Sequence, residues 1–272
     1  MLGKLFKYEF KACSRVILPV FGAAIITSLL ASLLTLISPS TNVMNPGSQA
    51  ANVFIGFISS FIMIAFVALI YAAILVSFIY SLIRFRKSLL GSEGYLMNTL
   101  PVSALSNVVA KILCAFVFEV LSVLTIVICM LIFVLVATKT SLATFFSGFS
   151  EIAYAFAQLG IDGWVFFVLL LITMIVGTIK SNAMIYAAMA IGHSFNGKKR
   201  LKSIGIFILA GVVENILVSV FLSTGALKNV DVDTAMSAFN LLFGLVIIVS
   251  IILAVGYTAI ASYFISKRLN LE

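Results

Sequence analysis

The chain has 272 residues, of which 63% are hydrophobic and only 10% are charged. An ordinary soluble domain carries roughly 25% charged residues, and too little of its volume is interior to bury so much apolar surface. A soluble fold is therefore excluded, and so is a disordered chain. The absence of alternating ten-residue segments argues against an outer-membrane barrel. The composition predicts an all-α, polytopic membrane protein.

Long apolar runs predict six membrane spans in a single transmembrane domain over residues 1–272. Each span needs about 20 apolar residues. The expected spans are residues 16–37, 52–83, 107–137, 164–192, 204–223 and 239–265. The second, third and fourth are longer than a hydrocarbon core of about 30 Å requires, so they should tilt or project into water. The first run follows basic residues, as in a signal peptide, but its length and poor cleavage site predict an uncleaved span.

The basic residues predict the orientation of these spans. Fourteen of the 17 Lys and Arg residues lie on one side of the six-span layout, within residues 4–15, 84–111, 198–202 and 267–268. By the positive-inside rule this side is the cytoplasm, and both termini are expected there. The net charge of +8 then reflects membrane topology, and no nucleic-acid partner is expected.

Residues 1–15 predict a basic amphipathic helix that lies along the inner leaflet and contacts membrane lipid. Its basic residues fall within about 80° of one another on a helical wheel; they are Lys4, Lys7, Lys11 and Arg15. Glu9 lies near the middle of the opposite, apolar face, where a carboxylate is costly unless it is paired. Two interpretations follow: the helix end frays and leaves Glu9 in water, or Glu9 meets a basic group of a partner.

The expected cytoplasmic loop over residues 84–106 is unusually apolar. Six apolar residues lie between positions 89 and 100: Leu89, Leu90, Tyr95, Leu96, Met97 and Leu100. Apolar residues on a water-facing loop often mark a protein contact, although a turn resting on lipid would have the same composition. The residues predicted to contact a partner are Glu93, Gly94, Tyr95, Leu96 and Leu100.

Three ionisable residues fall within the expected spans, namely Glu119, Lys180 and Glu214. Such residues are costly in lipid and usually pair or line a cavity. Each lies 12 or 13 residues from its cytoplasmic boundary, which corresponds to ~18–20 Å along a helix. The shared depth predicts that Lys180 pairs with at least one of the carboxylates, either to hold the bundle or to line a polar stretch of the path. The alternative is that Lys180 reaches the inner headgroups from a protruding fourth span.

Small residues recur every four positions in two spans. In the fourth span they are Ala183 and Ala187, and also Ala188 and Gly192; in the sixth they are Ser250, Ala254, Thr258 and Ser262. This spacing lets helices approach closely, either within one chain or between two chains.

The sequence contains no catalytic or metal-binding constellation. His193 is the one histidine, and the three cysteines show no framework spacing. Residues 192–199 nearly match the phosphate-binding loop G-x-x-x-x-G-K-[ST], but Lys199 takes the position that must offer a hydroxyl group to Mg²⁺. We expect Gly197 to end the fourth span instead, and we expect the chain to be no enzyme and to bind no cofactor or metal ion.

Three segments resemble the permease subunits of ABC-2-type ATP-driven exporters, in the form common in Gram-positive bacteria. They are LFKYEFK at residues 5–11, LGSEGYLMNTLP at residues 90–101, which is the most specific, and KRLNLE at residues 267–272. The resemblance implies a membrane-spanning permease of a bacterial plasma membrane, with a coupling helix in the loop 84–106. It also implies a separate cytoplasmic ATPase that binds ATP and Mg²⁺, and a second permease, identical or different.

The residues alone leave other functions open. A secondary transporter and a non-transporting immunity or sensor protein fit the composition as well, although no repeat relates residues 1–137 to residues 138–272. The transported substrate is not indicated by the sequence.

Overall fold

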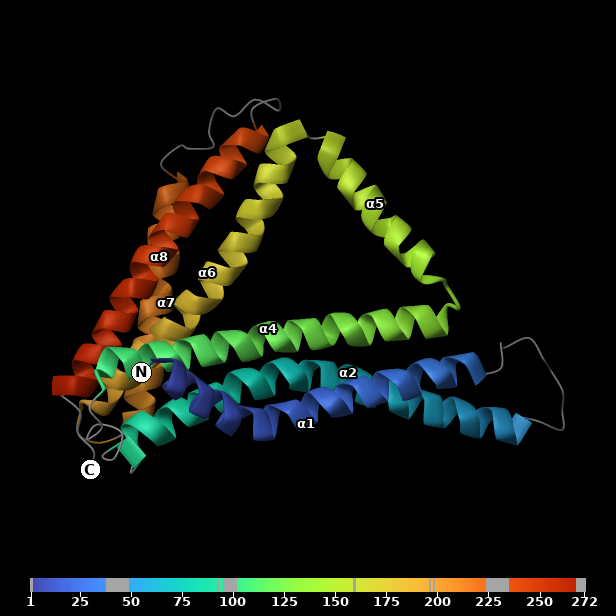
Figure 1. The fold of residues 1–272 in the computed structure, drawn as a ribbon, viewed down its shortest axis with the longest axis horizontal. Helices are drawn as coiled ribbons and strands as arrows, with labels where there is room; N and C mark the ends of the chain where they lie inside the picture. The colour runs from blue at the N-terminus through green and yellow to red at the C-terminus, as the bar shows by residue number, and fades with distance from the viewer. Residues whose placement is uncertain are drawn as a thin grey trace. The chain divides into compact units, whose positions relative to one another are not determined.

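The computed structural model is all-helical over the residues that it describes, which are 2–37, 49–91, 93–94, 102–158, 160–195, 197, 199–223 and 235–267. Its helices, shown in Figure 1, are α1 (Leu2–Ile37), α2 (Gln49–Phe85), the π-helical turn η2 (Arg86–Leu90), α4 (Ala104–Ala137), α5 (Leu142–Gln158), α6 (Gly160–His193), α7 (Lys199–Ser223) and α8 (Ala235–Lys267).

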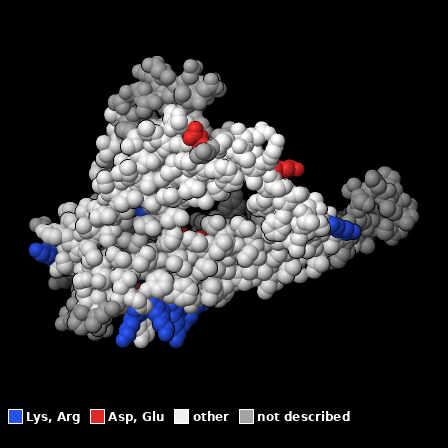
Figure 2. Space-filling view, turned by 45° about the horizontal axis from the view of Figure 1, so that its top comes forward, with Lys and Arg blue, Asp and Glu red and all other residues white. Residues whose placement is uncertain are grey.

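Among the described residues, six segments are helical, long and apolar enough to cross a membrane. They are Leu2–Leu36, Val53–Leu90, Ala104–Ala137, Asp162–His193, Lys199–Val220 and Ser237–Lys267, and each overlaps one predicted span. Most of the surface visible in Figure 2 is uncharged, as expected of helices whose outer faces meet lipid. The prediction of an all-α chain that fits a polytopic membrane protein is confirmed.

The basic N-terminal segment and the first span form one helix rather than two. The sequence predicts a separate interfacial helix over residues 1–15, but α1 continues without a break through Pro19 to Ile37. A helix of 36 residues extends about 54 Å, well beyond a hydrocarbon core of about 30 Å. One end of α1 must therefore project from the core, and the basic end is the one suited to water, because its four Lys and Arg side chains are exposed.

The helices form two compact units. One takes residues 1–9, 82–116 and 152–272, and the other takes residues 10–81 and 117–151. In the second unit, α1, α2 and α4 pack around Ala24, Ala31, Phe66 and Cys129. The rings of Phe66 and Phe133 stack with their centroids 5.4 Å apart. Small residues on α1 thus leave room for aromatic side chains from the neighbouring helices.

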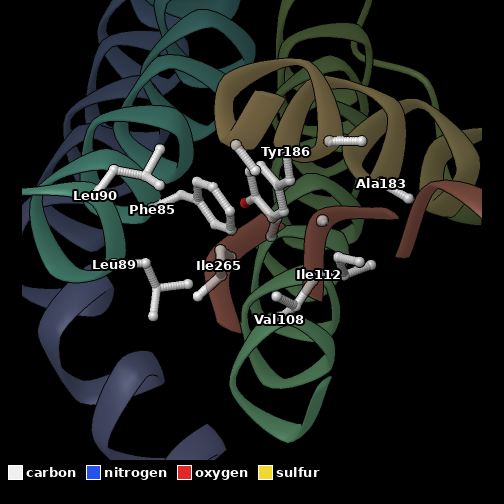
Figure 3. Packing of buried hydrophobic residues seen from close by; sticks show 12 residues of the cluster. Phe85, Leu89, Leu90, Val108, Ile112, Ala183, Tyr186 and Ile265 are labelled. Atoms are coloured by element: carbon white, nitrogen blue, oxygen red, sulfur yellow. The ribbon is translucent and has the colours of Figure 1, made fainter. Parts of the chain in front are cut away.

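The core of the first unit lies where the end of α2, η2, the start of α4 and the ends of α6 and α8 converge (Figure 3). Phe85 and Tyr186 stack at its centre, with ring centroids 4.0 Å apart. Val108, Ile112 and Ile265 close around them. α6 also packs against α7 and α8. This convergence holds Arg84 at the end of α2 and Lys111 at the start of α4.

Leu89 and Leu90 belong to this core, whereas the sequence places them on a water-facing loop. They are 0% and 5% exposed, because the chain stays helical through η2 and turns both side chains inward. The expectation that their apolar character marks a contact with a partner is wrong for these two residues. They stabilise the chain's own fold.

The small residues of α6 pack within the chain. Ala183, Ala187 and Ala188 are buried, and Gly192 lies against Ser203 at the start of α7. A Cβ atom on Gly192 would lie 2.6 Å from the backbone nitrogen of Ser203 and 2.7 Å from its Cα. A methyl group has no room there, so this crossing of α6 and α7 requires glycine.

Candidate functional site

Two clusters of charged and polar side chains lie in the unit formed by residues 1–9, 82–116 and 152–272. The N-terminal cluster contains Glu9, Arg84, Lys87, Glu93 and Lys111. The span cluster contains Lys180, Glu214 and Tyr257. Both are built from helices that the hydrophobic packing of this unit brings together.

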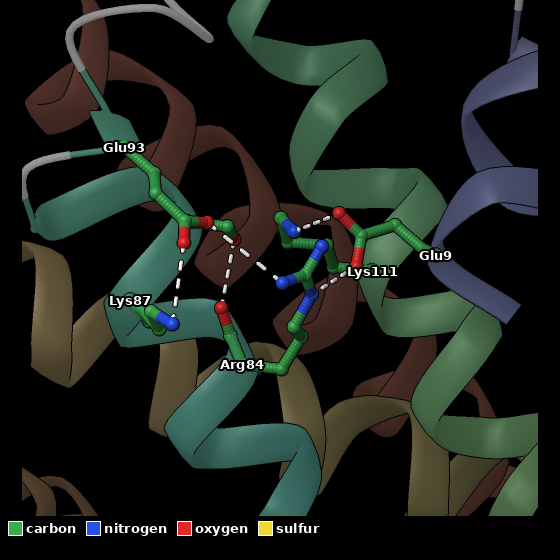
Figure 4. Close-up of polar contacts among 6 residues, drawn as sticks. Glu9, Arg84, Lys87, Glu93 and Lys111 are labelled. Atoms are coloured by element: carbon green, nitrogen blue, oxygen red, sulfur yellow. Dashed lines mark hydrogen bonds and ion pairs between the residues drawn. The ribbon is translucent and has the colours of Figure 1, made fainter. Parts of the chain in front are cut away.

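Glu9 lies at the centre of the N-terminal cluster (Figure 4). Its Oε1 accepts a hydrogen bond from Lys111 Nζ at 2.6 Å, and its Oε2 accepts one from Arg84 Nε at 3.1 Å. The Glu9 and Lys111 side chains are 6% and 5% exposed. Both interpretations of Glu9 drawn from the sequence are therefore wrong: it does not lie in water, and its basic partners belong to its own chain.

The pairing explains how a carboxylate is tolerated on the apolar face of α1. A buried charge costs several kcal/mol unless it is paired and hydrogen-bonded. Both oxygens of Glu9 are hydrogen-bonded to cations. One carboxylate between Arg84 and Lys111 leaves this part of the cluster with an excess positive charge, and a second carboxylate close by offsets it.

That second carboxylate is Glu93, which approaches Arg84 from the other side. Its Oε2 lies 3.8 Å from Arg84 Nη1, and its Oε1 lies 3.4 Å from Lys87 Nζ. The chain turns back after η2, where the Gly94 backbone N–H donates to the Gly91 carbonyl at 2.9 Å. A Cβ atom on Gly91 would lie 2.9 Å from the Lys87 carbonyl oxygen. Glycine at position 91 thus permits the turn that returns Glu93 to the end of α2.

Of the residues predicted to contact a partner, the structure describes two. The Glu93 side chain is 40% exposed and is already engaged by Arg84 and Lys87, while Gly94 is buried. Tyr95, Leu96 and Leu100 lie outside the described residues, so their role in docking stays a prediction.

The span cluster joins α6, α7 and α8. Lys180 Nζ donates a hydrogen bond to Glu214 Oε2 at 2.7 Å, and Tyr257 Oη donates one to Glu214 Oε1 at 2.8 Å. The Lys180 and Glu214 side chains are 22% and 15% exposed. The structure thus gives Lys180 one of the two carboxylates that the depth count predicts for it. The group is neutral as a whole, and both Glu214 oxygens are occupied.

Tyr257 carries no full charge, so a search of the spans for charged residues does not identify it. A signal is present, since Tyr257 precedes the end of α8 at Lys267 by 10 residues, or about 15 Å, close to the depth of the charged pair. Glu119 lies on α4 in the other unit, so its pairing with Lys180 stays a prediction.

The near-match to a phosphate-binding loop has a helical setting on both sides. α6 ends at His193 and α7 begins at Lys199, whereas a phosphate-binding loop follows a strand. Gly197 has a φ of 69°, a left-handed conformation that favours glycine. In the described part of the chain, no group of three or more His, Cys, Asp or Glu side chains is placed to hold a metal ion.

Comparisons with known proteins leave the family open. No family model, no curated protein and no solved structure matches the chain. Its function therefore has to be inferred from the six long apolar helices, the two clusters and the short segments that resemble exporter permeases.

Proposed function

We propose that the chain is the membrane-spanning permease subunit of an ATP-driven ABC exporter in a bacterial plasma membrane, with both termini in the cytoplasm. It forms the substrate path. A separate cytoplasmic ATPase, which binds ATP and Mg²⁺, docks on the loop between the second and third spans and supplies the energy. A second permease, the same chain or a different one, completes the transporter. The chain alone hydrolyses no ATP.

The observation that carries the proposal is the meeting of two permease-like segments at one arginine. Glu9 belongs to the segment 5–11 and Glu93 to the segment 90–101, and the carboxylates of both contact Arg84. An exporter needs its docking loop joined firmly to the spans, because a loop that moved freely would absorb the displacement caused by the ATPase. Glu93 of the loop contacts Arg84 of α2, and Arg84 and Lys111 of α4 both contact Glu9 of α1. This series of contacts suits that requirement.

The span cluster is the observation that favours a secondary transporter instead. Ionisable groups inside a membrane often mark ion pathways. In this cluster, however, Lys180 and Glu214 neutralise one another, and Tyr257 takes the remaining Glu214 oxygen. An arrangement of this kind is better suited to holding three helices together than to taking up and releasing a coupling ion.

The test is co-expression of the tagged chain with an ABC ATPase encoded beside its own gene. We expect the two to copurify, and we expect ATP hydrolysis by the reconstituted complex but not by the chain alone. A photo-crosslinking residue at position 96 should capture the ATPase, whereas one at Tyr154 of α5, which is 67% exposed and predicted to lie outside, should not.

The other outcomes identify the alternatives. Transport that follows an ion gradient, with no ATPase captured, would overturn the proposal in favour of a secondary transporter. A chain that neither transports nor binds an ATPase would overturn it in favour of an immunity or sensor protein. Glu93→Ala with Tyr95→Ala should leave the spans inserted while preventing the ATPase from copurifying.

A further inference from the structure

We propose that Arg84 is a positioning residue that couples the loop at Glu93 to the start of α1 through Glu9. The inference deepens the proposed function and rests on it for what moves the loop. The coupling itself is a property of this chain alone. It predicts that a change at Glu93 alters the order of the helical turns at residues 2–9, which lie 84 or more residues away in sequence.

The guanidinium group of Arg84 has a carboxylate on each of two edges. Nε lies 3.1 Å from Glu9 Oε2, and Nη1 lies 3.8 Å from Glu93 Oε2. Because the guanidinium group is planar and rigid, its two edges cannot move independently. A displacement of Arg84 toward or away from Glu93 therefore changes the hydrogen bond to Glu9. The close-up in Figure 4 shows Arg84 between the two glutamates.

The two contacts differ in strength, and the difference gives the coupling a direction. Glu9 is 6% exposed, and Lys111 holds its second oxygen at 2.6 Å. Glu93 is 40% exposed, and its contacts with Arg84 and Lys87 are longer, at 3.8 Å and 3.4 Å, of the kind that contribute little to stability. Glu93 is therefore the side that can be released without stranding a buried charge. A cationic group of a docking protein would compete with Arg84 for the Glu93 carboxylate. A shift of the loop would separate Glu93 from Arg84.

The backbone between Arg84 and Glu93 suits such a role. η2 lies between them, and π-helical turns are rare and occur frequently at functional sites. Ser88 Oγ donates to the Arg84 carbonyl at 2.7 Å, which holds the base of the arginine while its side chain reaches the glutamates. Lys87 forms an ion pair with Glu93, whereas the cations that contact Glu9 are Arg84 and Lys111, so Lys87 provides a matched control.

The experiment is hydrogen–deuterium exchange of the full chain in lipid nanodiscs, with no ATPase present. Glu93→Gln should raise exchange at residues 2–9 by about two- to fivefold, the change expected for loss of a partly exposed ion pair. Lys87→Gln should leave residues 2–9 unchanged. Arg84→Gln should raise their exchange by itself, and adding Glu93→Gln to it should have no further effect.

Glu9→Gln, which removes the buried carboxylate, is the positive control that the assay responds at these residues. Unchanged exchange at residues 2–9 in Glu93→Gln, while Glu9→Gln raises it, would overturn the coupling. The coupling would also be overturned if Lys87→Gln raised exchange at residues 2–9 as much as Glu93→Gln does. It would be overturned as well if Glu93→Gln raised this exchange by the same factor in the Arg84→Gln chain as in the unaltered chain. If Arg84→Gln does not fold, Arg84→Lys replaces it, because lysine keeps the charge without the two-edged geometry.

The two proposals fail separately. Exchange is measured without an ATPase, so a coupled chain that binds no ATPase would refute the proposed function and leave the coupling intact. The coupling alone would be refuted if the ATPase binds the chain and hydrolyses ATP, but Glu93→Gln leaves hydrogen–deuterium exchange at residues 2–9 unchanged. In a working complex, Arg84→Lys should lower transport per ATP hydrolysed without preventing the ATPase from copurifying.

Discussion

Replacing Lys180 by methionine should destabilise the chain far more than replacing Lys180 and Glu214 together. Lys180→Met removes the ammonium group that lies 2.7 Å from Glu214 Oε2 and strands a side chain that is only 15% exposed. Removing one partner of a buried ion pair costs roughly 3–5 kcal/mol, whereas replacing both with apolar or neutral groups is often nearly neutral. The Lys180 side chain is 22% exposed, so we expect a cost near the lower end of this range.

The assay is reversible unfolding of the detergent-purified chain, compared for Lys180→Met and for the double variant that also carries Glu214→Gln. Lys7→Met, which removes an exposed cation, controls for the loss of a positive charge alone. If Lys180→Met and the double variant unfold alike, then the reasoning is refuted. Lys180 would in that case be a hydrated residue that reaches the headgroups.

Three further predictions concern helix contacts, and each is read from the same unfolding measurement. Gly192→Ala should destabilise the chain by about 1–3 kcal/mol through its clash with the α7 backbone, whereas Gly177→Ala, which meets nothing within 4 Å, should stabilise it by about 0.5–1 kcal/mol; equal effects would contradict the close approach. Glu9→Gln should cost roughly 3–5 kcal/mol by stranding buried Lys111, and adding Lys111→Met should recover part of this loss. Tyr257→Phe should cost about 1 kcal/mol, for one lost hydrogen bond; no change would show that this bond contributes nothing.

The helices and the depth of the charged residues could be predicted from the sequence for a physical reason. In lipid, each segment must satisfy its own backbone hydrogen bonds, so a long apolar run becomes a helix whatever its neighbours are. The rise per residue is constant, so a residue count gives a depth. Lys180 and Glu214 could be matched in this way although 34 residues separate them. Their contact needs only that α6 and α7 are neighbours.

The N-terminal cluster could not be predicted in the same way. Arg84 and Lys111 lie 75 and 102 residues from Glu9, and the sequence assigns both cations to the cytoplasmic side as topology signals. A count of charges does not separate a hydrated lysine from one that is 5% exposed. The position of Glu9 on an apolar face is the valid clue that a partner exists. Identifying the partner requires knowing that the end of α2 and the start of α4 lie beside the first turns of α1.

Leu89 and Leu90 illustrate the same limit. Their apolar side chains indicate burial but do not say what buries them. The sequence interpretation places the partner outside the chain, whereas the structure places both residues in the chain's own core at 0% and 5% exposure. The remaining apolar residues of the loop, Tyr95, Leu96 and Leu100, keep their predicted role because they lie outside the described residues.

The buried contact between Glu9 and Lys111 also sets an order for the folding of the protein during its synthesis. Lys111 follows Glu9 by 102 residues, and at about 5–20 residues per second the ribosome needs roughly 5–20 s to supply it. Until then the Glu9 carboxylate lacks its lysine and is best kept hydrated. The first turns of α1 therefore reach their final place only after the start of α4 has been made.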